Sequence, residues 1–284
     1  MRRVVTYFVN IIGRALGRDG LWMSMQATRL SRRLEEAVWG VVESVVTFPA
    51  RRKLAPVVNR SHSAQANAVD RHWQAHTIRG RFFLKRQDSL DYIELLTDGR
   101  PYKRQLLRLH GPHTGKTILD YGCGPGNDLA GFAEFSGAAR IIGIDISERA
   151  LRLARARVSW HTQQRDLVEF IKIRDGDTGI PLADQSVDYI QSLGVIHHTS
   201  RPDKIFQELA RVLKPGGEVR IMLYNADSVH VQLTIGYQRL IVAGLQSGLT
   251  PEQAFERSAD LEAPIAHCVR PPDVSKWVAD SGLA

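Results

Sequence analysis

Cysteine is scarce in this sequence. The 284 residues include only two, Cys123 and Cys268, and two cysteines cannot build the disulfide framework of a small secreted domain. A core is not lacking, because 43% of the residues are hydrophobic, which excludes a globally disordered chain. We therefore expect a folded protein of a reducing compartment, the cytoplasm.

Long apolar runs are missing as well. No stretch approaches the roughly 20 consecutive apolar residues that a membrane-spanning helix needs. The apolar stretch 4–13 follows two arginines and imitates a secretory signal, but Asn10 interrupts it, and we see no small-residue cleavage site beyond it. We predict a retained helix.

The positive charge is concentrated at one end of the chain. The net charge is +8, and residues 1–60 alone hold 11 basic and four acidic residues, whereas residues 121–284 hold 17 basic and 20 acidic ones. A basic leading segment suggests a membrane surface, an acidic partner or an anionic substrate. Aromatic residues that would stack on bases are not interleaved with the basic ones, so nucleic acid is the less favoured partner.

Three segments follow from these patterns. Residues 1–60 form a basic amphipathic helical extension, residues 61–115 a helical lead-in that caps the substrate side, and residues 116–284 the main domain. We favour packing of the extension on the domain, with peripheral membrane contact as the alternative. Its apolar residues recur at helical spacing and share one face: Leu30, Leu34, Val38, Val42 and Val45.

From Lys116 onward, short apolar runs alternate with helical segments. This alternation predicts an α/β fold with a doubly wound, mostly parallel, Rossmann-like sheet. The predicted strands are Thr117–Tyr121, Arg140–Asp145, Glu169–Arg174, Val187–Ser192 and Glu218–Tyr224. The predicted helices are Asp128–Phe135, Glu148–Val158, Asp203–Leu213 and Pro272–Ser281.

A glycine-rich turn follows the first predicted strand, where Gly122, Gly124 and Gly126 alternate with other residues. In doubly wound sheets ligands bind outside the carboxyl ends of the strands, and glycines let the backbone bend and approach the ligand. A dinucleotide fingerprint would place its third glycine at position 127, which is Asn127. The carboxylate of Asp120 at the strand end also suits a cationic amine better than a pyrophosphate.

The second predicted strand ends at Asp145. A carboxylate at this position can accept hydrogen bonds from two ribose hydroxyls. Ile146 is placed to cover an adenine, and Ser147 is a good N-cap for the next helix. The two strand ends together predict a site for an amine-bearing nucleoside.

Residues 116–224 resemble class I S-adenosylmethionine-dependent methyltransferases, within the group that includes quinone and sugar O-methyltransferases. The matching pieces are ILDYGCGPG at 118–126, IIGIDIS at 141–147, IPLADQSVDYIQSLGVIHH at 180–198 and ELARVLKPGGEVRIMLY at 208–224. The resemblance implies S-adenosylmethionine as cofactor, with Asp145 at its ribose. It implies that the methionine moiety is held by Asp120 and the turn: Gly122, Cys123, Gly124, Pro125, Gly126 and Asn127.

The resemblance also implies an acid after the third strand that meets the adenine amine. Asp175 and Asp177 both suit this position, and the sequence does not choose between them. Leu193, at the end of the fourth strand, completes the expected cofactor set. Cys123 lies inside the turn, where we favour a small packing residue over a nucleophile.

His197 and His198 follow the fourth predicted strand, at the mouth of the expected pocket. Methyl transfer is an in-line displacement, so a base is needed only when the acceptor must lose a proton. A histidine can remove a hydroxyl proton, although either residue can instead serve only to cap the loop. We predict no metal ion.

The acceptor is less well defined by the sequence. Residues 191–194 lack the Asn/Asp-Pro-Pro-aromatic loop of many methyltransferases that act on amino groups of adenine or glutamine. We therefore predict methylation of a small molecule at oxygen. The alternatives are an RNA or protein methyltransferase that uses the basic leading segment, and a cofactor-binding module without turnover.

The class I sheet usually adds an antiparallel strand pair after its last parallel strand and one helix. Residues 282–284 resemble only the start of such a strand. We therefore expect a sheet without its final antiparallel pair, and a domain truncated at its C-terminus. An uncovered edge strand would be prone to pairing with other chains.

Overall fold

The computed structural model describes most of the chain beyond its leading segment. The described residues are 64–98, 108, 111–164, 166–177, 179–244, 248–258 and 263–283. The expected helical extension, residues 1–60, lies outside them. No helix in these ranges is both long and apolar enough to cross a bilayer.

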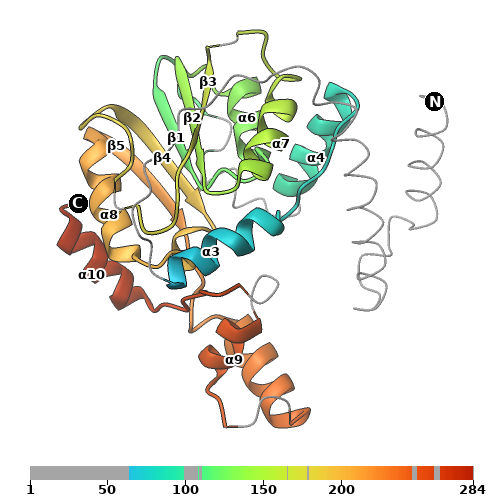
Figure 1. Cartoon of the computed structure of the whole chain (residues 1–284), viewed down its shortest axis with the longest axis vertical. Coiled ribbons are helices and arrows are strands. Elements are labelled where there is room, and N and C mark those ends of the chain that lie inside the picture. Colours follow the sequence, from blue (N-terminus) through green and yellow to red (C-terminus); the bar gives the residue numbers. More distant parts are fainter. Residues whose placement is uncertain are drawn as a thin grey trace, which may run out of the picture. The chain divides into compact units, whose positions relative to one another are not determined.

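A five-stranded sheet forms the centre of the fold, with the strand order β3-β2-β1-β4-β5 and every pairing parallel (Figure 1). Strands β1, β2 and β4 are buried along nearly their whole length, as expected of central parallel strands. The prediction of a doubly wound α/β sheet is confirmed. The strands are β1 (Thr117–Tyr121), β2 (Arg140–Asp145), β3 (Val168–Lys172), β4 (Val187–Leu193) and β5 (Leu213–Met222).

Helices cover both faces of the sheet (Figure 1). On one face α6 (Asn127–Phe135) and α7 (Glu148–Val158) bury apolar side chains against the strands. On the other face α8 (Pro202–Val212) and α10 (Pro271–Ser281) do the same. The hydroxyl of Ser147 accepts the Ala150 N–H at 3.2 Å and caps α7 as predicted.

The last strand begins earlier than predicted. β5 starts at Leu213 rather than at Glu218 and ends at Met222. Leu213 pairs with Val187 and Glu218 with Tyr189, so a bulge between these pairs takes up the intervening turn. The apolar pattern did not reveal this strand start because the residues between Leu213 and Glu218 are a lysine, a proline and two glycines, which do not continue an apolar run.

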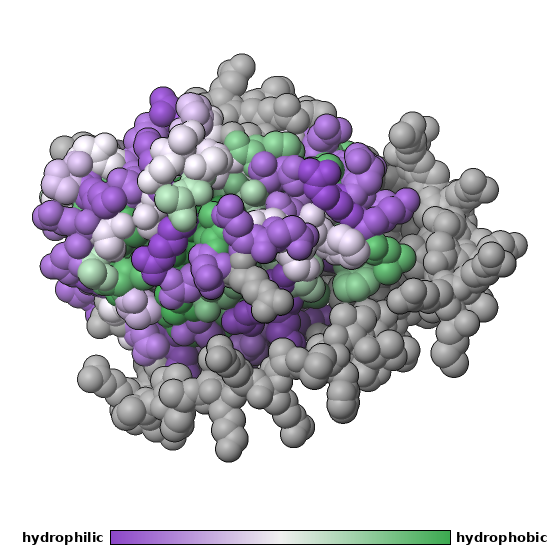
Figure 2. Space-filling view, turned by 90° about the horizontal axis from the view of Figure 1, so that it is seen from above, coloured by the Kyte–Doolittle hydropathy of each residue, from purple (hydrophilic) through white to green (hydrophobic). Residues whose placement is uncertain are grey.

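Two helices precede the sheet. α4 (Arg86–Asp98) packs against α6, and α3 (Ala64–Ala75) lies across the end of the sheet at which the strands finish (Figure 1). The opposite end is mostly hydrophilic, with apolar residues showing in patches between polar ones (Figure 2). Ligands of such sheets bind at the carboxyl ends of the strands, so α3 lies on the side where a site is expected.

A helical pair separates β5 from α10 and was not predicted. It consists of a π-helix, η2 (His230–Val242), and α9 (Pro251–Ser258). The chain leaves the sheet and returns to it at one bridge, where the Ala226 N–H donates to the Val269 carbonyl and the Val269 N–H to the Tyr224 carbonyl. The pair has its own small core, made by Val231, Ile235, Ala254, Phe255 and Ala266.

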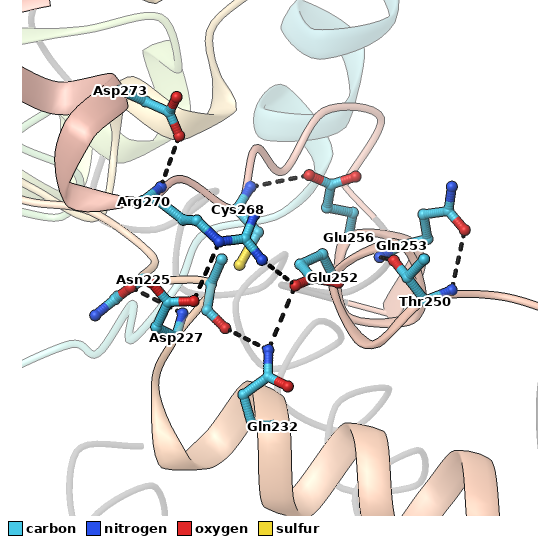
Figure 3. Close-up of polar contacts among 11 residues, drawn as sticks. Asn225, Asp227, Gln232, Thr250, Glu252, Gln253, Glu256, Cys268, Arg270 and Asp273 are labelled. Carbon is cyan, nitrogen blue, oxygen red and sulfur yellow. Dashed lines mark hydrogen bonds and ion pairs between the residues drawn. The ribbon is translucent and has the colours of Figure 1, made fainter. Parts of the chain in front are cut away.

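Arg270 connects this pair to the start of α10 (Figure 3). Its guanidinium lies 3.1 Å from the Asp227 carboxylate and 2.6 Å from that of Glu252. Its backbone N–H donates to Asp273 at 2.9 Å. The predicted last helix is present as α10, which ends at Ser281 with Gly282 as its C-cap, and no antiparallel strand pair is found among the described residues.

A chain of hydrogen bonds joins α4, α6 and α7 on one side of the sheet. The Arg157 Nε donates to the Ser89 hydroxyl at 2.9 Å, and the His161 Nε2 lies 2.8 Å from that same oxygen. The His161 Nδ1 lies 3.0 Å from the Glu134 carboxylate. Because the carboxylate can only accept, Nδ1 carries a proton, and Nε2 accepts from the hydroxyl in the neutral ring.

Acidification is expected to weaken this chain. Burial lowers the pKa of His161, against the opposing effect of Glu134, so below about pH 6.5 the unfolded state binds the proton more readily than the folded one. Stability therefore falls as the pH falls through this range. The measurement is the free energy of unfolding at several values between pH 7.5 and 5.5, for the wild type and His161→Gln.

The expected result is a shallower pH dependence in His161→Gln. Burial also lowers the pKa of His113, which contributes in the same direction, so the test compares the two slopes rather than seeking a flat line. Equal slopes in the two proteins would show that His161 does not titrate on unfolding.

Candidate functional site

A cavity of about 280 Å³ lies where the parallel strands end, and residues of α3 contribute to its wall. Residues of the turn after β1, the ends of β2 and β4 and the segments that follow β3 and β5 contribute to its wall. From α3 and the loop that follows it come Val69, Trp73, His76, Thr77, Ile78 and Arg79. The sheet and the lead-in thus enclose one site.

The glycine-rich turn approaches the cavity with little side-chain bulk. Gly122 has φ +80°, and a Cβ there would lie 2.2 Å from Val195 Cγ2. Gly124 has φ +53°, and a Cβ there would meet no protein atom within 4 Å. Because Gly124 also lines the cavity, its open side leaves room for a ligand to contact the backbone.

Two carboxylates from neighbouring strands line this cavity. Asp145 accepts the Gly124 N–H at 2.7 Å through one oxygen and the Ser147 N–H at 2.7 Å through the other. Burial raises the pKa of Asp145, although these N–H groups act in the opposite direction. Asp120, at the end of β1, is 4% exposed and lines the same cavity.

This arrangement fits a nucleoside that carries an amino acid. A carboxylate pair suits an amine and ribose hydroxyls, and the open side of Gly124 leaves room for close approach of the backbone. Ile146 adds an apolar surface next to Asp145. The residues present therefore fit S-adenosylmethionine.

Most of the predicted site residues line the cavity. Two do not: Gly126, which lies against Ala154 of α7, and His197, which is fully buried with its ring 3.9 Å from that of Tyr224. The predicted residues that do are Asp120, Gly122, Cys123, Gly124, Pro125, Asn127, Asp145, Ile146, Asp175, Asp177, Leu193 and His198.

Cys123 combines a place in the cavity wall with a place in the core. Its side chain belongs to an apolar cluster with Leu129 and Ile141. Burial raises the pKa of its thiol well above the usual value, so the reactive thiolate is disfavoured. This environment favours a packing role over that of a nucleophile.

Asp175 and Asp177 both line the cavity, on either side of Gly176. The Asp175 carboxylate accepts the Ser200 N–H at 3.1 Å, which ties the loop after β3 to the loop after β4. The Asp177 carboxylate accepts the Arg174 N–H at 3.2 Å within its own turn. Each acid has a backbone partner, so these contacts leave both as candidates for the adenine amine.

His198 reaches the cavity from the turn after β4. Its Nδ1 lies 2.6 Å from the Ile265 carbonyl oxygen, which can only accept, so Nδ1 carries a proton and the neutral ring has its lone pair at Nε2. The ring lies edge-on to Trp73 at 5.0 Å and to Tyr224 at 5.7 Å. Within the described ranges, no group of three or more His, Cys, Asp or Glu side chains could hold a metal ion.

Comparison with known proteins agrees with this geometry. Residues 112–250 match the model of a methyltransferase domain family. An uncharacterized 37.1 kDa protein in transposon TN4556 of Streptomyces fradiae is 32% identical over 241 residues, which cover 82% of this chain and 63% of that protein.

Two further relatives are named for their activities. A ubiquinone biosynthesis O-methyltransferase of Leptothrix cholodnii is 25% identical over 61% of this chain and 66% of its own length. An arsenite methyltransferase of Aquipseudomonas alcaligenes is 33% identical over 40% of this chain and 34% of its own length. The chain thus spans less than two thirds of the length of the Streptomyces relative and about one third of the arsenite enzyme.

The parallel sheet, the glycine-rich turn and the paired carboxylates agree with the matched methyltransferase domain. Together they support a class I S-adenosylmethionine-dependent methyltransferase domain in the part of the chain that the family model matches, residues 112–250.

Proposed function

We propose that this protein transfers a methyl group from S-adenosylmethionine to an oxygen atom of a small-molecule acceptor. One observation carries the proposal: a single cavity contains both the carboxylates that fit the cofactor and a histidine whose Nε2 has a lone pair. Donor and base are thereby within reach of one acceptor.

The cofactor lies, in this proposal, along the ends of β1 and β2. Asp145 accepts hydrogen bonds from the ribose hydroxyls, Asp120 faces the amine, and Ile146 covers the adenine. S-adenosylmethionine supplies a methyl group already activated by a positively charged sulfur. The chain therefore has to hold the two reactants in line and keep water out.

The acceptor lies on the side of α3 and the turn after β4. Trp73, His76 and Tyr224 line the cavity there together with His198. His198 takes the hydroxyl proton at Nε2 while Nδ1 continues to donate to the Ile265 carbonyl. The fixed Nδ1 contact keeps the ring oriented, which is the usual requirement for a histidine base.

Oxygen is the proposed target because a hydroxyl must lose its proton when it is methylated, and His198 can accept that proton. The relative named as an O-methyltransferase supports this choice. The relative named for arsenite has a different acceptor atom, so transfer to sulfur, nitrogen or arsenic is the alternative outcome of an acceptor screen. A labelled-methyl screen across small-molecule fractions distinguishes these classes.

The cofactor part of the proposal is tested by Asp145→Ala. We expect this variant to bind S-adenosylmethionine about 1.5–3 kcal/mol more weakly, because charged hydrogen bonds are lost. Isothermal titration measures the effect. Asp166→Ala, which removes an exposed acid outside the cavity wall, is the control and should bind like the wild type. Unchanged affinity in Asp145→Ala would remove this residue from the site.

A further inference from the structure

A buried arginine lies directly behind the glycine-rich turn. Arg157 of α7 is 3% exposed. Its Nε donates to the Ser89 hydroxyl and its Nη2 to the Ser89 carbonyl at 3.3 Å. The guanidinium lies 4.4 Å from the ring centre of Phe83 and 5.4 Å from that of Tyr92. These contacts fix both its position and its plane.

The third hydrogen bond of this guanidinium reaches the cavity wall. Arg157 Nη1 donates to the side-chain oxygen of Asn127, the first residue of α6 and part of the cavity wall. A guanidinium has only donors, so the oxygen of the Asn127 amide must face Arg157. Arg157 itself does not line the cavity. Because the amide oxygen of Asn127 faces Arg157, its NH₂ is the group left to face the cavity.

The charge of Arg157 should strengthen this donor. Burial lowers the pKa of Arg157 to about 10, so it remains charged at neutral pH. A positive charge bonded to the amide oxygen polarises the amide and makes its NH₂ a better donor. The N-terminus of α6 adds positive potential at the same place. All these effects favour an anionic group of the ligand beside Asn127.

We propose that Arg157 is a positioning residue that directs the Asn127 amide NH₂ at the carboxylate of the cofactor's methionine moiety. The inference rests on the proposed function. Asp120 then faces the amine of the same moiety. The positive amine thus meets a carboxylate, and the negative carboxylate meets a hydrogen-bond donor. Lysine could not replace Arg157, because it cannot hold Ser89 and Asn127 at once in one plane.

Two ligands test this assignment: S-adenosylhomocysteine and its decarboxylated analogue, which keeps the amine and lacks only the carboxylate. Asn127→Asp replaces the donor by an oxygen that also carries negative charge. We expect it to weaken binding of S-adenosylhomocysteine about 10- to 100-fold and to leave binding of the analogue nearly unchanged. Isothermal titration gives both affinities.

Arg157→Lys should also weaken binding of S-adenosylhomocysteine more than binding of the analogue. The loss of affinity should be smaller than in Asn127→Asp, because the Asn127 amide is still a donor and has lost only its fixed orientation. Asn225→Asp, which lies outside the cavity wall and keeps its acceptor oxygen for the Asp227 N–H, is the matched control. Because Arg157 is buried, its variant is interpreted only if it melts cooperatively. Asn127→Asp carries the test on its own.

The outcomes separate the two proposals. Equal weakening of both ligands, or no weakening of either, in Asn127→Asp would overturn the carboxylate assignment while the cofactor site stands. A wild-type protein that binds neither ligand would overturn the proposed function and this inference with it.

Discussion

Replacing His198 by asparagine is expected to lower kcat for methyl transfer to a hydroxyl acceptor by about 10²- to 10⁴-fold, the range for loss of a positioned base. In the wild type the Ile265 carbonyl accepts a hydrogen bond from the His198 Nδ1–H. An asparagine amide can still donate this hydrogen bond. The turn after β4 is therefore kept while the lone pair at Nε2 is lost. Steady-state kinetics with an acceptor found in the screen measures the effect.

The affinity for the cofactor adds a second readout. Loss of the base should leave the affinity for S-adenosylmethionine unchanged. His230→Asn, which changes an exposed histidine outside the cavity wall, is the control and should keep wild-type kinetics. An His198→Asn enzyme with wild-type kcat would show that the acceptor needs no base from this residue.

Replacing Gly122 by alanine is expected to destabilise the domain and to abolish cofactor binding. The new Cβ would lie 2.2 Å from Val195 Cγ2 and 2.4 Å from Cγ1, so the turn or the β4 loop must move. Overpacking of this kind costs about 1–3 kcal/mol, and the left-handed φ of +80° adds about 1–2 kcal/mol for a residue with a Cβ. Urea unfolding and isothermal titration measure the two losses.

Two further variants separate the clash from the backbone strain. Gly124→Ala shares the left-handed conformation but meets no protein atom, so it should lose less stability while its Cβ still occupies ligand space. Val195→Ala combined with Gly122→Ala removes both methyl groups of the closest contacts and should recover part of the stability. If Gly122→Ala were as stable as the wild type, the turn would have to be more adaptable than its contacts indicate.

The first two strands could be predicted to the residue because their sequences carry the whole signal. β1 and β2 are short apolar runs bounded by polar residues and followed by a turn motif, and both bounds agree with the structure. β5 could not be bounded in this way. Its start depends on the pairing of Leu213 with Val187, which is a contact between distant parts of the chain.

The residues that line the cavity could be predicted only in part, because some of them are brought there by contacts between distant parts of the chain. Asp120 and Asp145 belong to motifs at strand ends, whereas Trp73 lies on α3, where no motif marks it. The place of α3 depends on contacts such as that from Gln74 Nε2 to the Ile146 carbonyl at 2.6 Å, across 72 residues of sequence. The spacing of motifs along neighbouring elements does not encode such a contact.

The two adjacent histidines show a limit of another kind. In the sequence His197 and His198 are equivalent candidates, and both fall in one short 3₁₀ turn. The turn directs one ring under Tyr224 and the other toward the cavity. The direction of a side chain within a turn is a property of the folded backbone, so residue type and spacing could not separate them.

The bridge between Asn225 and Val269 makes the helical pair an insertion whose two ends lie side by side at the sheet. Because the chain departs from and rejoins the scaffold at neighbouring points, its length and composition can vary without shifting any strand of the sheet. A replacement would need two ends that meet and a return segment that offers a carbonyl to His198, and it would have to replace the contacts that Glu252 makes with Arg270 and Phe255 with Tyr224. A change in the helical pair can thus leave the donor site at the ends of β1 and β2 unaltered, because no described residue of η2 or α9 lines the cavity.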